Sequence, residues 1–202
     1  MNELLMVFVK DSSKYPVKTR LKTAIGKKKS IWIYNQILDK TVLVLKNIKI
    51  DIAVFHYNSI ISKNPFKSFS KWNKIQIGKN LGEKISNAFS WGFEKGYKKI
   101  IILGSDLWDL NEEIIYKSFL ELNTNQVVVG PSIDGGYYLL GLNKKMPKIF
   151  KGIKWSTKNV LSETLKLLDN DPYILPELND IDTLEDLIAN PSLFKLYNNN
   201  FK

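Results

Sequence analysis

The amino-acid sequence predicts one α/β domain whose mostly parallel sheet is covered by helices on both faces. Apolar segments rich in Ile, Val and Leu alternate with segments of helical periodicity, and the connections between most of them are short. Polar motifs follow directly after several of the predicted strands, which is where ligands bind in sheets of this kind. A length of 202 residues suits a single domain with a substantial core.

In the first half of the chain, strands are predicted at 4–9, at 50–55 and, as a short segment, at 75–77. Apolar and β-branched residues follow one another in these segments, as they do in buried strands. Helices are predicted over 27–47 and 81–95, because apolar residues recur there at the spacing of one helical face.

The second half continues the same alternation. Strands are predicted at 99–103, 126–129 and 137–142, and helices at 111–122, 157–168 and 183–189. We assign residues 1–197 to a single domain. Residues 198–202 are expected to form a polar tail that frays, because the segment begins with three consecutive asparagines at the end of the chain.

The net charge of +10 comes from lysine, since all but one of the thirty basic residues are Lys. The lysines are scattered along the chain, and no zinc-finger or RNA-recognition pattern accompanies them. Nucleic acid is therefore not expected to be the main partner. A polyanionic small substrate explains the charge more simply.

No apolar run approaches the roughly 18–20 residues that cross a bilayer, so no membrane span is expected. The first apolar run lacks a preceding basic region, which argues against a signal peptide. The absence of cysteine excludes disulfides, thiolate zinc sites and cysteine nucleophiles, and it is compatible with a reducing compartment. We expect a cytoplasmic protein.

The one arginine, Arg20, lies in the motif Lys18-Thr19-Arg20-Leu21, between the first predicted strand and a helix. In a chain whose skewed composition suggests a drift from arginine to lysine, the one remaining arginine suggests a role that needs a planar guanidinium. Phosphate recognition is such a role, because the guanidinium donates two parallel hydrogen bonds. The alternative is a surface arginine retained by chance.

Asp106 follows the apolar strand at 99–103 in the motif Gly104-Ser105-Asp106. A carboxylate at the carboxyl end of a central strand can hold a divalent metal ion that bridges phosphate oxygens. The competing interpretation is a turn or a helix cap. Asp109, just before the next predicted helix, fits a cap better.

The segment Asp134-Gly135-Gly136 lies between two predicted strands and is typical of a hairpin turn. Adjacent glycines beside a carboxylate also let a ligand approach the backbone closely. The two interpretations are compatible. Tyr137 and Tyr138 follow in a strand, where successive side chains point to opposite faces, so at most one faces a pocket.

Asp182, followed by Glu185 three residues later, has the pattern of a helix cap. Together with Asp180 and Asp186, it nevertheless offers a second carboxylate for a metal ion. His56 is the only histidine, so no histidine metal cluster can form, and we interpret it as structural.

Taken in chain order, these motifs resemble the signatures of one known group of proteins. The segments that carry the resemblance are Lys18-Thr19-Arg20-Leu21, Gly78-Lys79-Asn80-Leu81-Gly82-Glu83-Lys84, Gly104-Ser105-Asp106, the run from Gly130 to Leu142, Trp155-Ser156 and Asp180-Ile181-Asp182-Thr183. The group is a bacterial family of small glycosyltransferase-A-fold proteins long catalogued as a domain of unknown function. It is akin to the 2-phospho-L-lactate guanylyltransferases and to molybdenum-cofactor guanylyltransferase.

The resemblance implies a nucleotide-sugar or nucleoside-triphosphate donor held on Mg²⁺ or Mn²⁺. The implied roles are phosphate contacts for Lys18 and Arg20, metal ligation for Asp106 and Asp182, flanking of the nucleotide for Glu83 and Lys84, and an acceptor loop formed by Asp134, Gly135, Gly136 and Tyr137. The sequence departs from the family pattern at Tyr15, Asn80, Lys84, Leu107 and Trp108.

These features together predict a metal-dependent transferase that uses a nucleotide-sugar donor and an unidentified small-molecule acceptor. A metal ion on Asp106, shared with Asp182, would bridge the donor phosphates, and Lys18 and Arg20 would neutralise the charge on the departing phosphate. Asp134 would take the acceptor's proton. One alternative is a nucleotidyltransferase that uses a nucleoside triphosphate. The other is a non-catalytic protein that binds a nucleotide or a nucleic acid.

Overall fold

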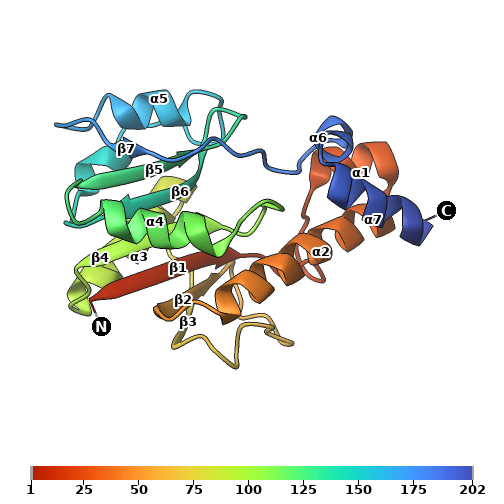
Figure 1. The fold of residues 1–202 in the computed structure, drawn as a ribbon, viewed down its shortest axis with the longest axis horizontal. Coiled ribbons are helices and arrows are strands. Elements are labelled where there is room, and N and C mark those ends of the chain that lie inside the picture. Colours follow the sequence, from red (N-terminus) through yellow and green to blue (C-terminus); the bar gives the residue numbers. More distant parts are fainter. Residues whose placement is uncertain (1, 202) are drawn as a thin grey trace.

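The computed structural model describes residues 2–201 and contains a seven-stranded sheet with the order β3-β2-β1-β4-β6-β5-β7 (Figure 1). The strands are β1 Glu3–Val9, β2 Asp51–His56, β3 Trp72–Ile75, β4 Lys99–Gly104, β5 Val127–Pro131, β6 Tyr137–Leu142 and β7 Tyr173–Ile174. Strand β6 runs antiparallel to β4 and β5, and every other neighbouring pair is parallel. The predicted mostly parallel sheet is confirmed.

Helices cover both faces of this sheet, as predicted. They are α1 Thr19–Ile25, α2 Lys27–Lys46, α3 Leu81–Glu94, α4 Glu112–Glu121, α5 Val160–Leu165, α6 Leu184–Ala189 and α7 Pro191–Phe201, with a 3₁₀ turn, η1, at Pro147–Phe150. None of the helices in the described part of the chain combines the length and the apolar character that a membrane crossing requires.

The alternation of side chains along the central strands builds two separate cores. In β1, Leu5 packs with α2 and α4 on one face, whereas Met6 packs with α3 and η1 on the other. Ile101 and Ile102 of β4 divide in the same way. Because each fully buried side chain of this size contributes about 1.5–3 kcal/mol, the two faces fix the sheet between its helices.

A third apolar cluster lies beyond the carboxyl ends of β1 and β4, where α1, α2, α6 and α7 pack together (Figure 1). Its buried centre consists of Leu21, Ile33, Ile37, Ile181, Leu187 and Leu193. This cluster holds the C-terminal part of the chain against the loop that follows β1.

Residues 198–201 differ from the prediction of a frayed polar tail at 198–202, whose last residue, Lys202, lies outside the described residues. Helix α7 continues through the asparagines to Phe201. The ring of Phe201 packs edge-on against Trp32 of α2 at a centroid distance of 5.2 Å, and the ammonium of Lys29 lies 5.3 Å from its centroid. The tail is therefore ordered by one aromatic residue whose partners lie far away in the sequence.

Smaller differences concern the ends of elements. Strand β3 pairs with β2 at residues 72–75 rather than at the predicted 75–77. Helix α5 is shorter than the predicted 157–168, because the Thr157 hydroxyl donates to the carbonyl of Lys154 and accepts from the backbone N–H of Asn159. These bonds favour a turn before the helix begins.

Gly82 in α3 is required by packing, because an added Cβ would lie 2.2 Å from the indole ring of Trp155. We predict that Gly82→Ala lowers the free energy of unfolding by roughly 1–3 kcal/mol, since the indole is part of a core and has little room to move. Urea denaturation measures the effect. Gly104→Ala is the matched control, because no atom lies within 4 Å of its added Cβ. Equal stability of the two variants would contradict the prediction.

Candidate active site

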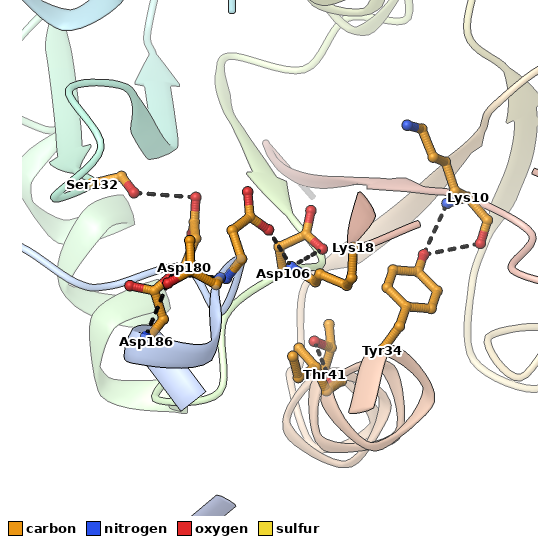
Figure 2. A network of polar contacts seen from close by, with 11 residues as sticks. Lys10, Lys18, Tyr34, Thr41, Asp106, Ser132, Asp180 and Asp186 are labelled. Carbon is orange, nitrogen blue, oxygen red and sulfur yellow. Dashed lines mark hydrogen bonds and ion pairs between the residues drawn. The ribbon is translucent and has the colours of Figure 1, made fainter. Parts of the chain in front are cut away.

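The side chain of Lys18 lies between two carboxylates at the carboxyl ends of β1 and β4. Its Nζ is 2.7 Å from Oδ1 of Asp106 and 3.0 Å from Oδ1 of Asp182 (Figure 2). Only 2% of the Lys18 side chain is exposed, whereas the two aspartate side chains are about half exposed. The structure thus brings together three of the residues predicted from sequence.

Lys18 adopts a left-handed backbone conformation, with φ 46° and ψ 51°, at the residue before α1. Burial alone would lower the pKa of its ammonium, but the charges of Asp106 and Asp182 and their hydrogen bonds outweigh burial and raise it. Lys18 is therefore a fully charged, desolvated ammonium that depends on both carboxylates.

The carboxylate of Asp182 is available because the helix cap lies one residue further along the chain. Thr183 caps α6 in a reciprocal pair with Asp186, whose carboxylate also accepts from the backbone N–H of Asp182. The predicted cap formed by Asp182 and Glu185 is therefore wrong. Thr183, in β-region geometry, completes the capping box with Asp186, and the Asp182 carboxylate pairs with Lys18 instead.

The predicted cap role of Asp109 is also wrong. The side chain of Asn111 caps α4 by accepting from the backbone N–H of Ile114. Asp109 instead accepts a hydrogen bond from the amide of Asn190, between α6 and α7. Beside it, the indole N–H of Trp108 donates to Ser192 at 2.7 Å. These contacts fasten the C-terminal helices to the loop that carries Asp106.

An extended C-terminal segment runs beside the ends of β4 and β5. Leu107 forms an isolated antiparallel bridge with Asp180, and Ser132 forms a parallel one with Leu178. Within this segment, the side chain of Ile181 is buried in the third cluster. Since alternate side chains of an extended segment share a face, Asp180 and Asp182 both lie on the side away from that cluster.

Asp180 was noted in the sequence only as a neighbour of Asp182, and the structure places it in the site with contacts of its own. Its Oδ2 accepts a hydrogen bond from the Ser132 hydroxyl at 3.1 Å (Figure 2). Burial, followed by the nearby charge of Asp106, raises the pKa of its carboxyl to about 7. Asp134 and Asp182 act on it in the same direction, so all four carboxylates belong to one electrostatic neighbourhood. The sequence feature that indicates this role is Asp180-Ile181-Asp182, in which two aspartates flank an apolar residue.

The loop after β1 contains no glycine and is closed by side-chain hydrogen bonds. Asp11 is buried and accepts from the backbone N–H and hydroxyl of Ser13, and its carbonyl accepts from Tyr15 N–H. The hydroxyl of Tyr34 donates to the carbonyl of Lys10 and accepts from its N–H (Figure 2). A side-chain turn thus replaces the backbone freedom of glycine.

Arg20 lies in the first turn of α1 and is exposed. Within residues 2–201 its guanidinium takes part in no recorded ion pair or side-chain hydrogen bond. Its position next to Lys18 in the chain is compatible with the predicted phosphate contact, but the structure gives it no partner of its own.

A group of basic and aromatic side chains surrounds Tyr57, directly after β2. The ammonium of Lys84 lies 4.3 Å from the ring centroid of Tyr57 and that of Lys10 lies 5.1 Å from it. Tyr15 packs edge-on against the same ring at 5.0 Å. Lys84 was predicted to flank the nucleotide. Tyr57 was missed because nothing in the sequence links it to the loop after β1.

Glu83 has a clear structural role. Its carboxylate accepts from the backbone N–H of Lys79, while its own N–H donates to the side chain of Asn80, which caps α3. Asn80, in place of the usual aspartate, therefore retains the capping function. Gly78, with φ 147°, packs against the backbone of Lys84, where a Cβ would come within 2.7 Å.

The predicted acceptor loop is a tight turn packed against the segment before α5. Asp134 accepts from the backbone N–H of Gly136, and Gly135 has φ 87°. A Cβ on Gly135 would lie 2.0 Å from the carbonyl oxygen of Lys158. The turn interpretation is confirmed. The group that comes close to Gly135 is the backbone of Lys158 in the same chain.

The two tyrosines after this loop point to opposite faces, as predicted. Tyr138 lies in the first core and donates to the carbonyl of Pro176, while Tyr137 packs edge-on against Trp155 in the second. The Tyr137 hydroxyl is buried without a recorded hydrogen-bond partner. Tyr137 therefore differs from the prediction of a side chain in the acceptor loop, since its ring is a core element.

His56 is structural, as predicted. It is fully buried, its Nε2 lies 3.0 Å from the side-chain oxygen of Asn73, and its Nδ1 accepts from the backbone N–H of Ile61. Burial lowers the pKa of its imidazole. The side chain thus links the end of β2 to β3 and the loop between them.

The side chains around Lys18 fit a divalent cation of the magnesium type. Asp106 and Asp182 already share one cation, and both retain exposed oxygen atoms. The described residues contain no cluster of three or more side chains arranged to enclose a metal ion by themselves. Protein sites commonly hold Mg²⁺ through one or two carboxylates together with water and substrate phosphates, and Asp106 and Asp182 provide two carboxylates.

Residues 62–157 match a family model described as "Uncharacterized protein conserved in bacteria (DUF2064)". The resemblance inferred from the sequence motifs is confirmed. The match includes the segment from Gly78 to Lys84, Asp106, and the run from Gly130 to Leu142. A comparison with curated proteins gave no significant match.

Among solved structures, one similar to this chain is a Desulfovibrio desulfuricans G20 protein provisionally described as a nucleotide-diphospho-sugar transferase. The two are 26% identical, with a TM-score of 0.85 over 98% of this chain and 95% of the other. The predicted nucleotide-diphospho-sugar transferase fold is thereby confirmed.

Two more distant structures share the fold. The 4-diphosphocytidyl-2C-methyl-D-erythritol synthase from Anaerococcus prevotii DSM 20548 is 13% identical, with a TM-score of 0.62 over 96% of this chain and 95% of the other. The inositol-1-phosphate CTP transferase from T. maritima is 11% identical, with a TM-score of 0.55 over 98% and 95%. At these identities the likeness concerns the fold alone.

Replacing the partners of Lys18 should reveal how much the buried ammonium depends on them. We predict that Asp106→Asn and Asp182→Asn each lower the free energy of unfolding, because the buried ammonium loses one of its two partners. The loss should be limited to about 1–2 kcal/mol, since each carboxylate is about half exposed and water weakens its ion pair. The double variant should lose more than the sum, since it leaves a buried ammonium with no carboxylate. Urea denaturation of the three variants measures this. Strict additivity would contradict the coupling.

Proposed function

We propose that the protein is a metal-dependent transferase that uses a nucleotide-sugar donor. The observation that carries the proposal is the buried Lys18 ammonium between Asp106 and Asp182 at the carboxyl ends of β1 and β4. In open α/β sheets this edge is where ligands bind. A donor diphosphate needs both kinds of group found here, carboxylates for a metal ion and cations for its own oxygens.

In the proposed site Asp106 and Asp182 hold Mg²⁺ or Mn²⁺. When bound, the ion neutralises charge on the donor phosphates and favours departure of the nucleotide. Lys18 and Arg20 place positive charge beside the same phosphates, and their contribution grows as negative charge accumulates on the leaving group. The net charge of +10 favours encounter with a polyanionic donor.

Lys84, Lys10 and Tyr57 extend the proposed donor site along the carboxyl ends of β1 and β2. The two ammoniums and the aromatic ring they contact offer charge and a flat surface to the nucleoside end of the donor. On the other side of the carboxylates, the exposed Asp134 is the proposed proton acceptor for a hydroxyl of the acceptor. Gly135 and Gly136 hold its loop in a tight turn.

A nucleotide-sugar donor is preferred because the D. desulfuricans protein, which is similar over nearly the whole chain, is described as a nucleotide-diphospho-sugar transferase. Nucleotidyl transfer is the second candidate. It is retained because a structure of the same fold, which this chain matches over 95% of its length, is described as an inositol-1-phosphate CTP transferase. The fold itself does not distinguish attack at an anomeric carbon from attack at an α-phosphorus.

A ligand screen followed by product analysis tests the proposal. Nucleotide sugars and nucleoside triphosphates, each with Mg²⁺ or Mn²⁺, are expected to include a donor that raises the melting temperature, because it binds only the folded state. Release of a nucleoside diphosphate from a sugar donor supports glycosyl transfer. Release of pyrophosphate supports nucleotidyl transfer. A flat thermal response across the panel, or tight binding only to nucleic acid with a steep salt dependence, would overturn both.

Arg20 provides the most specific test of the donor contacts. We predict that Arg20→Lys, which retains the charge and removes the planar fork, raises the donor dissociation constant by about tenfold, equivalent to about 1.4 kcal/mol. Isothermal titration with the donor found in the screen measures the change. Lys22→Met, an exposed change on the same helix, is the control and should leave the affinity within about twofold. An unchanged affinity in Arg20→Lys would exclude a bidentate contact.

A further inference from the structure

Lys18 occupies the place between the two carboxylates that a shared cation requires. Its Nζ contacts Oδ1 of Asp106 and Oδ1 of Asp182 within 3.0 Å, and its side chain is almost completely buried. A divalent ion shared by the same two oxygens competes directly with this ammonium. In the free protein the Lys18 ammonium therefore occupies the proposed metal site itself.

We propose that the substrate is the preformed donor–metal complex and that Lys18 excludes free divalent ions from Asp106 and Asp182. The inference rests on the proposed function, since it presupposes a metal-bound phosphate donor. In the free protein the ammonium satisfies both carboxylates. When the complex binds, its phosphate oxygens accept the ammonium while the carboxylates receive the ion. Lys18 is thus a specificity-determining residue that makes metal binding depend on the donor.

Loss of partners explains why the free ion is excluded. The Lys18 ammonium is buried, and its partners are one oxygen of Asp106 and one of Asp182. A divalent ion that took these two oxygens alone would leave the buried ammonium without an anionic partner. A donor diphosphate supplies oxygens that replace the carboxylates as partners of the ammonium.

The surrounding structure restricts where Lys18 can go. Its backbone is held in the left-handed region at φ 46°, and the first bond of α1 runs from Lys22 N–H to its carbonyl. A large displacement of the backbone would disrupt that turn, so the ammonium must find its new partner within reach of its side chain. Phosphates bound by the same carboxylate-held ion satisfy this condition.

Metal-binding measurements on the parent and on Lys18→Met test the inference without reference to catalysis. Isothermal titration with MnCl₂, first alone and then with an excess of the donor identified by the screen, gives the affinities. In the parent, Mn²⁺ alone should bind weakly, and its affinity should rise by about tenfold or more with donor. In Lys18→Met, Mn²⁺ alone should bind about tenfold or more tightly than in the parent, because no ammonium competes for the oxygens.

Two controls separate the explanations. Lys22→Met removes an exposed ammonium from the same helix and should bind Mn²⁺ as the parent does. Adding Asp182→Asn to Lys18→Met should cancel the gain, because the second carboxylate is lost. If Lys18→Met does not fold, the two titrations of the parent decide the question, since tight binding of Mn²⁺ without donor would overturn the inference.

The failure of this inference differs from the failure of the proposed function. Equal Mn²⁺ affinity in the parent and in Lys18→Met, with donor binding retained, would remove the exclusion role of Lys18 and leave the transferase proposal intact. Absence of both metal binding and donor binding in every variant would overturn the two together.

Discussion

The rest of the site depends on the burial of a single ammonium, that of Lys18. Because a desolvated charge is costly without partners, its two ion pairs must form in the folded protein when no donor is bound. The pairs join three segments that are far apart in sequence, namely the loop after β1, the end of β4 and the extended segment before α6. Lys18 therefore sets the relative positions of the groups that are proposed to bind the donor.

The cap of α6 leaves the carboxylate of Asp182 free to pair with Lys18. Three helices near the sheet's carboxyl edge are capped by residues with no other proposed role: Asn80 for α3, Asn111 for α4 and Thr183 for α6. Each accepts a hydrogen bond from a backbone N–H group in the first turn of its helix. Asp182 can pair with Lys18 because Thr183 and Asp186 complete the cap. Because the cap of α6 lies at Thr183 and not one residue earlier, the local structure of α6 determines that the Asp182 carboxylate contributes its charge to the site.

Features that depend on local periodicity could be predicted from sequence, and those that depend on distant partners could not. The apolar runs that place Leu5 and Met6 in two cores predicted the central strands. Asp106 was then predicted from its place at the carboxyl end of one of these strands. The role of Asp180 was missed because its partner Ser132 lies in another loop. The helical end at Phe201 was missed because its partners Trp32 and Lys29 lie far away in the sequence. The position of the α6 cap was missed because Asp182 and Thr183 are both good capping residues, and tertiary contacts with Lys18 decide between them.

The geometry of the site depends on the C-terminal helices. Asp182 reaches Lys18 only if the segment before α6 lies beside β4, and the third apolar cluster holds it there through Ile181, Leu187 and Leu193. Trp108, one of the departures from the family pattern, strengthens the same attachment through Ser192. Its neighbour Leu107 bridges Asp180. These two residues immediately follow Asp106, so the substitutions couple the metal-facing loop to the element that delivers the second carboxylate. Their effect is to stabilise the geometry of the pair, because a free C-terminus would leave the Lys18 ammonium buried with one partner.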